Sequence, residues 1–180
     1  MTALNPSTSG APTSPTNTEN QLTVRVTDEQ DHVQLEATRY EQLARSVLNK
    51  QGINQASELS VLFVSPETIA ELNEQHMGHT GPTDVLAFPI DEDATQPQAE
   101  NDAPLLLGDV VVCPAVAATN CSVNKGSYPG HQGTVTDELD LLVVHGILHV
   151  LGMDHAEVEE RRDMQALERQ HLAVFRGREL

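Results

Sequence analysis

The chain has 180 residues, is 38% hydrophobic but only 3% aromatic, and carries a formal net charge of −17. This length allows one domain whose core consists mainly of aliphatic side chains. The charge excludes a protein that coats DNA or RNA nonspecifically, because polyanion binding draws on clustered Lys and Arg and the chain has only ten such residues.

The sequence predicts a cytoplasmic protein that does not contact a membrane. No apolar run reaches the roughly 18 residues of a transmembrane helix, and the N-terminus has neither the basic start nor the apolar stretch of a secretory signal. Cys113 and Cys121 fit no CxxC or disulfide pattern, so we expect both thiols to be reduced.

Residues 1–20 differ in composition from the rest of the chain. They are rich in Ser, Thr, Pro and Asn and have few large apolar side chains, so they cannot bury enough surface to offset the entropy lost on ordering. We expect a disordered tail over 1–20 and a single folded domain over 21–180.

The first half of this domain is predicted to alternate strands and helices. Alternating apolar residues indicate a half-buried strand at 22–26, and helical spacing follows at 40–48. A short β-branched run predicts a strand at 59–64. The pair Ser65–Pro66 is typical of a helix start, so a second helix is expected directly after it.

The second half contains two more predicted strands, at 85–90 and 105–112, separated by an acidic, proline-containing loop at 91–104. A glycine-rich loop at 124–133 precedes a helix that carries histidines, and a last helix begins after His155. This order of elements predicts an α+β fold in one domain, with helices packed on a small mixed sheet. The apolar face of the last helix is expected to contain Met164, Leu167, His171 and Phe175.

Three histidines in the segment 145–155 predict a metal site. His145 and His149 are four residues apart, so on a helix both imidazoles lie on one face. Gly152 tolerates positive φ, so the helix can end there and the chain can turn to bring His155 to the same point. Three imidazoles with a fourth position open form the ligand set of a catalytic zinc. A capping-box pattern at 134–137 predicts the start of this helix.

The spacing of the histidines is similar to that of zinc peptidases, with one difference. Those enzymes have a glutamate general base directly after the first histidine, where this chain has Gly146. A glycine inside a helix indicates close approach of another group, either a backbone or a substrate, or tight packing of the helix on a strand. Asp154 beside the last histidine is expected either to orient a ligand or to cap the final helix.

The histidine segment, HGILHVLGMDH, resembles the HGxLHxxGxDH signature of the YbeY-type rRNA maturation endoribonucleases. Three further segments agree in order. Leu72–Asn73 is followed by residues 82–89, PTDVLAFP, which are similar to the PTDVLSFP block of that family, and residues 107–110 match its LGD strand start. The resemblance extends over about residues 22–175, and the combination of the histidine and PTDVL motifs is highly specific.

The resemblance implies a zincin-like histidine helix with one zinc per chain, bound by His145, His149 and His155. It implies a single-strand-selective endoribonuclease that matures the 3′ end of small-subunit rRNA and acts in ribosome quality control. The expected partners are the rRNA precursor and the small ribosomal subunit, with ribosomal or assembly proteins, but neither DNA nor a membrane. The reactive group is expected to be a zinc-bound water, because no catalytic side chain is identified.

Some residues near the motif have two interpretations. The family often has an arginine that would bind a phosphate where this chain has Met77. His76 and His79 either replace part of that charge when protonated or are surface histidines, and the second interpretation is favoured. Thr83 and Asp84 are expected to line the cleft beside the metal, although Asp84 is equally well explained as a turn residue before a strand.

Two other functions fit parts of the sequence. A metallopeptidase would use the same histidines but lacks the glutamate. A noncatalytic ribosome-assembly factor, with zinc only holding the C-terminal helices together, agrees with the acidic charge and with Met77. A structural zinc would be needed for folding, whereas an open catalytic site should lose activity before it loses its fold.

Overall fold

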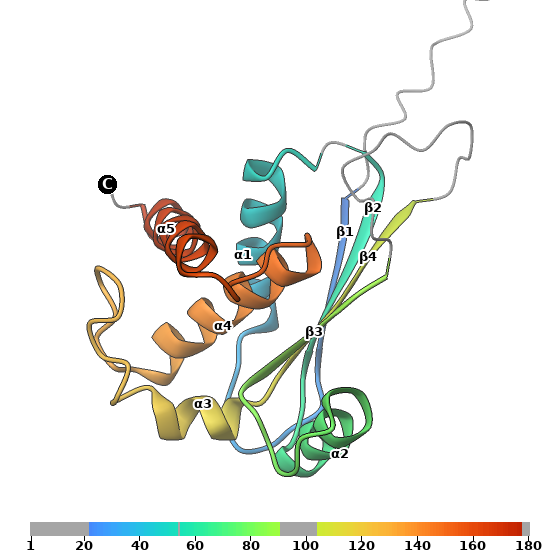
Figure 1. The fold of residues 1–180 in the computed structure, drawn as a ribbon, viewed down its shortest axis with the longest axis vertical. Helices are drawn as coiled ribbons and strands as arrows, with labels where there is room; N and C mark the ends of the chain where they lie inside the picture. The colour runs from blue at the N-terminus through green and yellow to red at the C-terminus, as the bar shows by residue number, and fades with distance from the viewer. Residues whose placement is uncertain (1–21, 54, 91–103, 178–180) are drawn as a thin grey trace, which may run out of the picture.

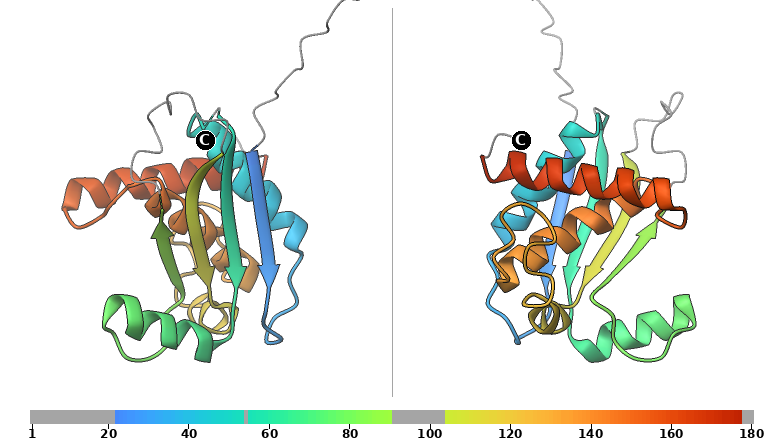
Figure 2. Two further views of the ribbon diagram at one scale, coloured as in Figure 1. Left: turned by 90° about the vertical axis from the view of Figure 1, so that its right-hand side faces the viewer. Right: turned by 60° about the vertical axis from the view of Figure 1, so that its left-hand side comes forward.

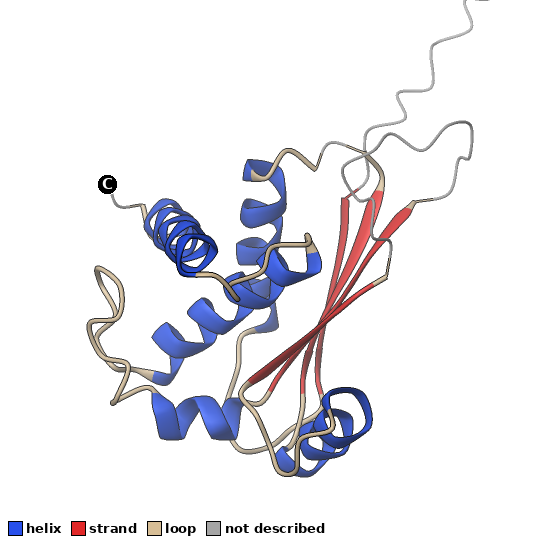
Figure 3. Cartoon of the chain, in the orientation of Figure 1, coloured by secondary structure: helices blue, strands red, loops and turns tan. Residues whose placement is uncertain are grey.

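The structure is a computed structural model that describes residues 22–53, 55–90 and 104–177. The predicted tail and most of the predicted loop at 91–104 lie outside these ranges. The sheet elements are β1 (Leu22–Asp28), β2 (Ser57–Phe63), β3 (Val85–Pro89) and β4 (Leu105–Val112). The helices are α1 (Ala37–Lys50), α2 (Pro66–Met77), α3 (Pro114–Asn120), α4 (Val135–Val150) and α5 (Val158–Phe175). Figure 3 shows how these two kinds of element are distributed.

The four strands form one mixed sheet in the order β1-β2-β4-β3. β1 pairs with β2 and β2 with β4 in parallel, while β3 runs antiparallel to β4, with Val85 opposite Val112. The α+β fold and the mixed sheet predicted from the sequence are therefore confirmed. β3 is an edge strand of the described sheet, and it is in contact with the histidine helix, α4.

The helices cover the two faces of the sheet unequally. α1 and α4 pack on one face, α5 lies over α4, and α2 lies on the opposite face near one end (Figures 1 and 2). The larger core lies between the sheet and α1, α4 and α5; its fully buried members include Leu43, Val47, Phe63, Leu107, Ile147 and Leu148. Ile69 of α2 packs in a smaller core on the other face. Among the described helices, none is long and apolar enough to cross a membrane.

A buried ion-pair network connects α1, α4 and α5. The side chain of Asp140 is fully buried, and its carboxylate accepts hydrogen bonds from Arg39 Nη2 and Arg176 Nη2, each at 2.6 Å. Arg176 also pairs with Asp137 at 2.8 Å. No local sequence pattern predicts this network, because it connects residues of three different helices. Arg176 is the C-cap residue of α5 and anchors the end of that helix to the first turns of α4.

Candidate metal centre

α4 carries the first two histidines and starts where the sequence predicted. The capping box is confirmed: the Asp137 N–H donates to Thr134 Oγ1 at 3.1 Å, and the Thr134 N–H donates to the Asp137 carboxylate at 3.3 Å. This reciprocal pair satisfies N–H groups that a helix start leaves unpaired, and so fixes the first residue of the helix. His145 and His149 lie in the last turns of α4, half-buried and on one face.

The turn after α4 brings the third histidine back to the first two. Gly152 adopts φ of 86°, a left-handed conformation that L side chains rarely adopt. Its N–H donates to the carbonyl of His149 at 2.9 Å, and the Met153 N–H donates to that of Leu148 at 3.0 Å. These bonds end the helix as the glycine predicted, and His155 follows three residues later.

The three imidazoles converge. One nitrogen of each of His145, His149 and His155 lies within 4.8 Å of the others. The Nε2 atoms of His145 and His149 are 3.1 Å apart. Two nitrogens bound tetrahedrally at zinc distances of 2.0–2.1 Å would be separated by about 3.3 Å, so this pair is already at the spacing of metal ligands.

The remaining nitrogens of two imidazoles have partners that orient them. His145 Nδ1 lies 2.7 Å from Glu168 Oε1 on α5. His149 donates a hydrogen bond to the backbone carbonyl of Met153. Such contacts set the tautomer and leave the Nε2 lone pair available, which is the usual arrangement behind a histidine that binds a metal.

The electrostatics of the site favour a neutral His149. Burial lowers the pKa of His149 below its ordinary value, and the neighbouring His145 and His155 lower it further. A neutral imidazole is the form that donates a lone pair to a metal. The donor set of three half-buried nitrogens, one backed by a carboxylate, therefore fits a borderline-soft divalent ion such as zinc.

Gly146 has a packing role. A Cβ at this position would lie 2.4 Å from Val110 Cγ1 of β4 and 3.3 Å from Val85 Cγ2 of β3. The glycine therefore lets α4 approach the sheet closely, which decides between the alternatives left open by the sequence. The contact also places the helix, and with it His145 and His149, directly over the edge strand.

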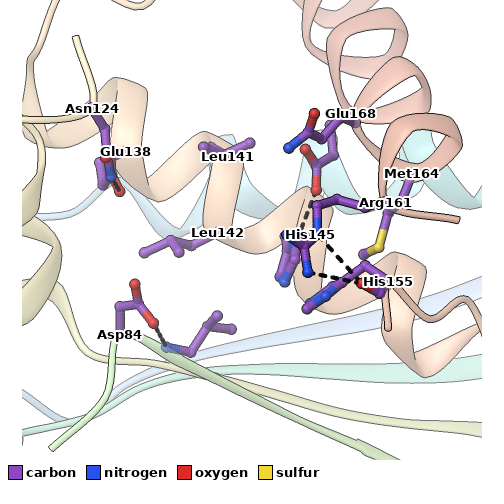
Figure 4. Close-up of a pocket in the computed structure, with 12 residues that line it drawn as sticks. Asp84, Asn124, Glu138, Leu141, Leu142, His145, His155, Arg161, Met164 and Glu168 are labelled. Carbon is purple, nitrogen blue, oxygen red and sulfur yellow. Dashed lines mark hydrogen bonds and ion pairs between the residues drawn. The ribbon is translucent and has the colours of Figure 1, made fainter. Parts of the chain in front are cut away.

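Two cavities open from the histidines. The first, which we call the α5-side cavity, has a volume of about 340 Å³ and extends from His145 and His155, beneath α5, to Asn124 and Glu138. Figure 4 shows these two ends, with Leu141 and Leu142 between them. The second, the β3-side cavity, has a volume of about 550 Å³ and is lined by all three histidines and by residues of β3. The metal centre is therefore open to molecules on both sides.

Of the other candidate residues near the motif, some line the two cavities and some do not. Asp84 lines both cavities, and its carboxylate also accepts the Val85 N–H at 2.9 Å, so its two predicted roles coexist. Thr83 donates to Asp84 at 3.3 Å and does not line either cavity. Met77, 44% exposed, lines the β3-side cavity together with the histidines.

His76 and His79 lie outside the site. Both are exposed, and His76 packs its ring against Phe88 at 4.9 Å between centroids. Neither lines the two cavities, which agrees with the favoured interpretation of surface histidines.

The role proposed for Asp154 in capping the final helix is wrong. Its carboxylate accepts the N–H of His155 at 2.6 Å. The N-cap of α5 is instead Glu157, which forms a capping box with Glu160. Asp154 therefore holds the backbone of the third histidine in the turn. The physical reason is that the turn after Gly152 is too long for Asp154 to reach the first free N–H groups of α5.

Sequence reasoning missed Glu168. The predicted apolar face of α5 is confirmed, because Met164 and His171 are buried and Leu167 and Phe175 are partly buried against the core. The buried set also includes Glu168 and Leu172, which were not predicted. Glu168 follows Met164 by four residues, so a carboxylate on the buried face was present as a signal. A buried acidic side chain needs a partner, and the partner here is His145.

The fold and the three converging histidines define a small α+β protein with a candidate metal site. A family described as Endoribonuclease YbeY matches residues 25–176. The chain is 50% identical to the Endoribonuclease YbeY of Salinispora tropica over 140 residues, which cover 75% of this chain and 85% of the relative. It is 43% identical to that of a Nocardioides species over 157 residues, covering 87% and 100%.

A solved structure agrees with the fold. The solution structure of TM1509 from Thermotoga maritima matches with a TM-score of 0.55 and 27% identity, over 86% of this chain and 90% of that one. The chain belongs to the YbeY endoribonuclease family, as the resemblance of its motifs predicted.

Proposed function

We propose that this protein is a zinc-dependent endoribonuclease that cleaves single-stranded RNA in the maturation of the 3′ end of small-subunit rRNA, and that it acts in ribosome quality control in the cytoplasm. The observation that carries the proposal is the convergence of three imidazoles, one of them backed by Glu168, in a chain of the YbeY family. Its substrate is the rRNA precursor, free or on the small subunit.

Zinc bound by His145, His149 and His155 would supply Lewis acidity at a phosphodiester. The protein contributes the geometry. Glu168 orients His145, the Gly152 turn positions His155, and the two cavities leave room for an RNA strand to pass across the histidines. RNA also carries its own nucleophile, the 2′-hydroxyl, so the absence of a glutamate at position 146 does not prevent this reaction.

The test is RNA cleavage combined with metal analysis. The purified protein should contain one zinc and should cut a single-stranded rRNA precursor but not the same sequence in a duplex. Replacing His149 by Ala should lower zinc content well below one equivalent and abolish cleavage. His79→Ala is the matched control, because His79 is an exposed histidine outside both cavities.

Two results would contradict the proposal. Full zinc occupancy in the His149→Ala variant would remove the ligand assignment. A zinc-loaded wild type that binds the precursor without cutting it would favour the noncatalytic assembly role, and digestion of casein would indicate a peptidase.

A further inference from the structure

Few of the described positively charged side chains are free to bind an RNA phosphate. Among the described residues, carboxylates pair with Arg25, Arg39, Arg45, Arg162 and Arg176. The described cations that have no described carboxylate within ion-pair distance are Lys50, Lys125, Arg161 and Arg169. Of these four, Arg161 lines a cavity that opens from the three histidines. Its charge is therefore both unpaired and close to the metal centre.

Arg161 projects from the first turns of α5 over the histidines. Figure 4 shows its side chain beside His145 and His155, at the end of the α5-side cavity away from Asn124 and Glu138. Nε and Nη2 of Arg161 each lie 3.4 Å from the carbonyl oxygen of His155. These contacts are long and therefore weak. They hold the guanidinium near the site while its N–H donors stay available for a ligand.

Three carboxylates line the same cavity, those of Asp84, Glu138 and Glu168, and each has a partner. Asp84 accepts the Val85 N–H at 2.9 Å. Glu138 accepts from Asn124 at 2.6 Å and lies 2.9 Å from His131 Nε2, and Glu168 pairs with His145. They are therefore engaged in holding the fold and the histidines. The β3-side cavity shares Asp84 and adds Asp154, but its lining includes neither Lys nor Arg, and Met77 lies there.

We propose that Arg161 binds a phosphate of the RNA strand and so directs the strand to the α5 side of the histidines. The inference rests on the proposed function, because it assumes an RNA ligand. A guanidinium matches phosphate oxygens with two parallel N–H donors, and it is the only positive side chain that the described cavities offer beside the metal centre. Arg161 would then supply from α5 the cation that position 77 lacks.

The experiment compares Arg161→Gln with Arg162→Gln. The two variants lose one charge each from adjacent positions, so their net charges are equal and long-range repulsion of RNA cancels in the comparison. Arg162 is exposed, pairs with Asp163 and does not line the cavity. Zinc-loaded proteins are titrated with a short fluorescein-labelled, fully 2′-O-methylated single-stranded RNA, and affinity is measured by anisotropy over a range of KCl concentrations.

We expect Arg161→Gln to weaken binding about tenfold at low salt, as for one charge-assisted contact. The slope of log affinity against log salt should become shallower by about 0.7, which corresponds to one phosphate contact on a single strand. Arg162→Gln should stay close to wild type, and Arg161→Lys should lose less than Arg161→Gln. Zinc content should be the same in all four proteins.

Equal affinities and equal salt slopes for Arg161→Gln and Arg162→Gln would overturn the inference. So would loss of zinc in Arg161→Gln, because it would assign this side chain to holding the His155 turn. Failure of the proposed function is distinguishable. A wild type that shows the Arg161-dependent binding but cuts no RNA refutes the endonuclease and leaves the phosphate contact in place.

Discussion

Replacing Glu168 by Gln isolates the effect of one negative charge on the metal centre. Glutamine keeps the shape of the side chain and an oxygen that accepts from His145 Nδ1, but it removes the carboxylate charge that lies 2.7 Å from this ring. Glu168 is only 8% exposed, so water screens this charge weakly. Loss of the charge makes His145 a weaker lone-pair donor to zinc and removes an electrostatic attraction for the zinc ion.

The expected result is zinc affinity lower by about 10- to 100-fold, the range found when such partners of metal-binding histidines are changed. This equals roughly 1.4–2.7 kcal/mol of binding free energy. The assay is competition for zinc against a chromogenic chelator. Circular dichroism of the metal-free proteins checks that Glu168→Gln keeps its helices.

Glu159→Gln is the matched control. It removes the same charge from the first turn of the same helix, where the Glu159 side chain is exposed and makes no hydrogen bond or ion pair within the described residues. Equal zinc affinities for Glu168→Gln and Glu159→Gln would refute the reasoning, since the contact with His145 would then contribute nothing beyond net charge.

Three further predictions concern packing, pH and charge. Gly146→Ala should lower the free energy of unfolding by about 1–3 kcal/mol in urea denaturation, because its Cβ would lie 2.4 Å from Val110 Cγ1, and Val110→Ala should restore part of the loss. Burial lowers the pKa of His171, so the unfolded state binds more protons than the folded state at mildly acidic pH. As pH falls below about 6.5, the free energy of unfolding of the wild type should therefore decrease relative to that of His171→Gln. Parallel pH profiles of the two proteins would contradict this. Met77→Arg should tighten RNA binding at low salt by about tenfold or more, with a gain that shrinks as salt rises; unchanged binding would show that residue 77 does not face an RNA phosphate.

The elements whose signal is local were predictable. Hydrophobic periodicity and helix-capping residues predicted the four strands and the helices α1, α2, α4 and α5. The three histidines could be grouped because they lie within eleven residues joined by one turn. The short helix α3 (Pro114–Asn120) was missed. It has no amphipathic period, and a helix of seven residues is not stable alone; it forms because it packs on α4, with Ala117 buried.

The parts of the site that were missed come from α5. Glu168 and Arg161 reach the histidines only because α5 folds back over α4, and that position depends on tertiary contacts such as Arg176 with Asp140. No spacing within α5 encodes the distance to His145. The sequence carried the chemical types of these residues, but the packing of two helices decides which of them meet.

The contact between Gly146 and Val110 also limits how this site can change in evolution. A glutamate at position 146, as in zinc peptidases, has no space for its Cβ unless β4 gives way. Enlarging the helix residue alone would overpack the core, and shrinking the strand residue alone would leave a cavity. A path from this site to the peptidase motif would therefore pass through less stable single variants, so changes at positions 146 and 110 would have to occur together.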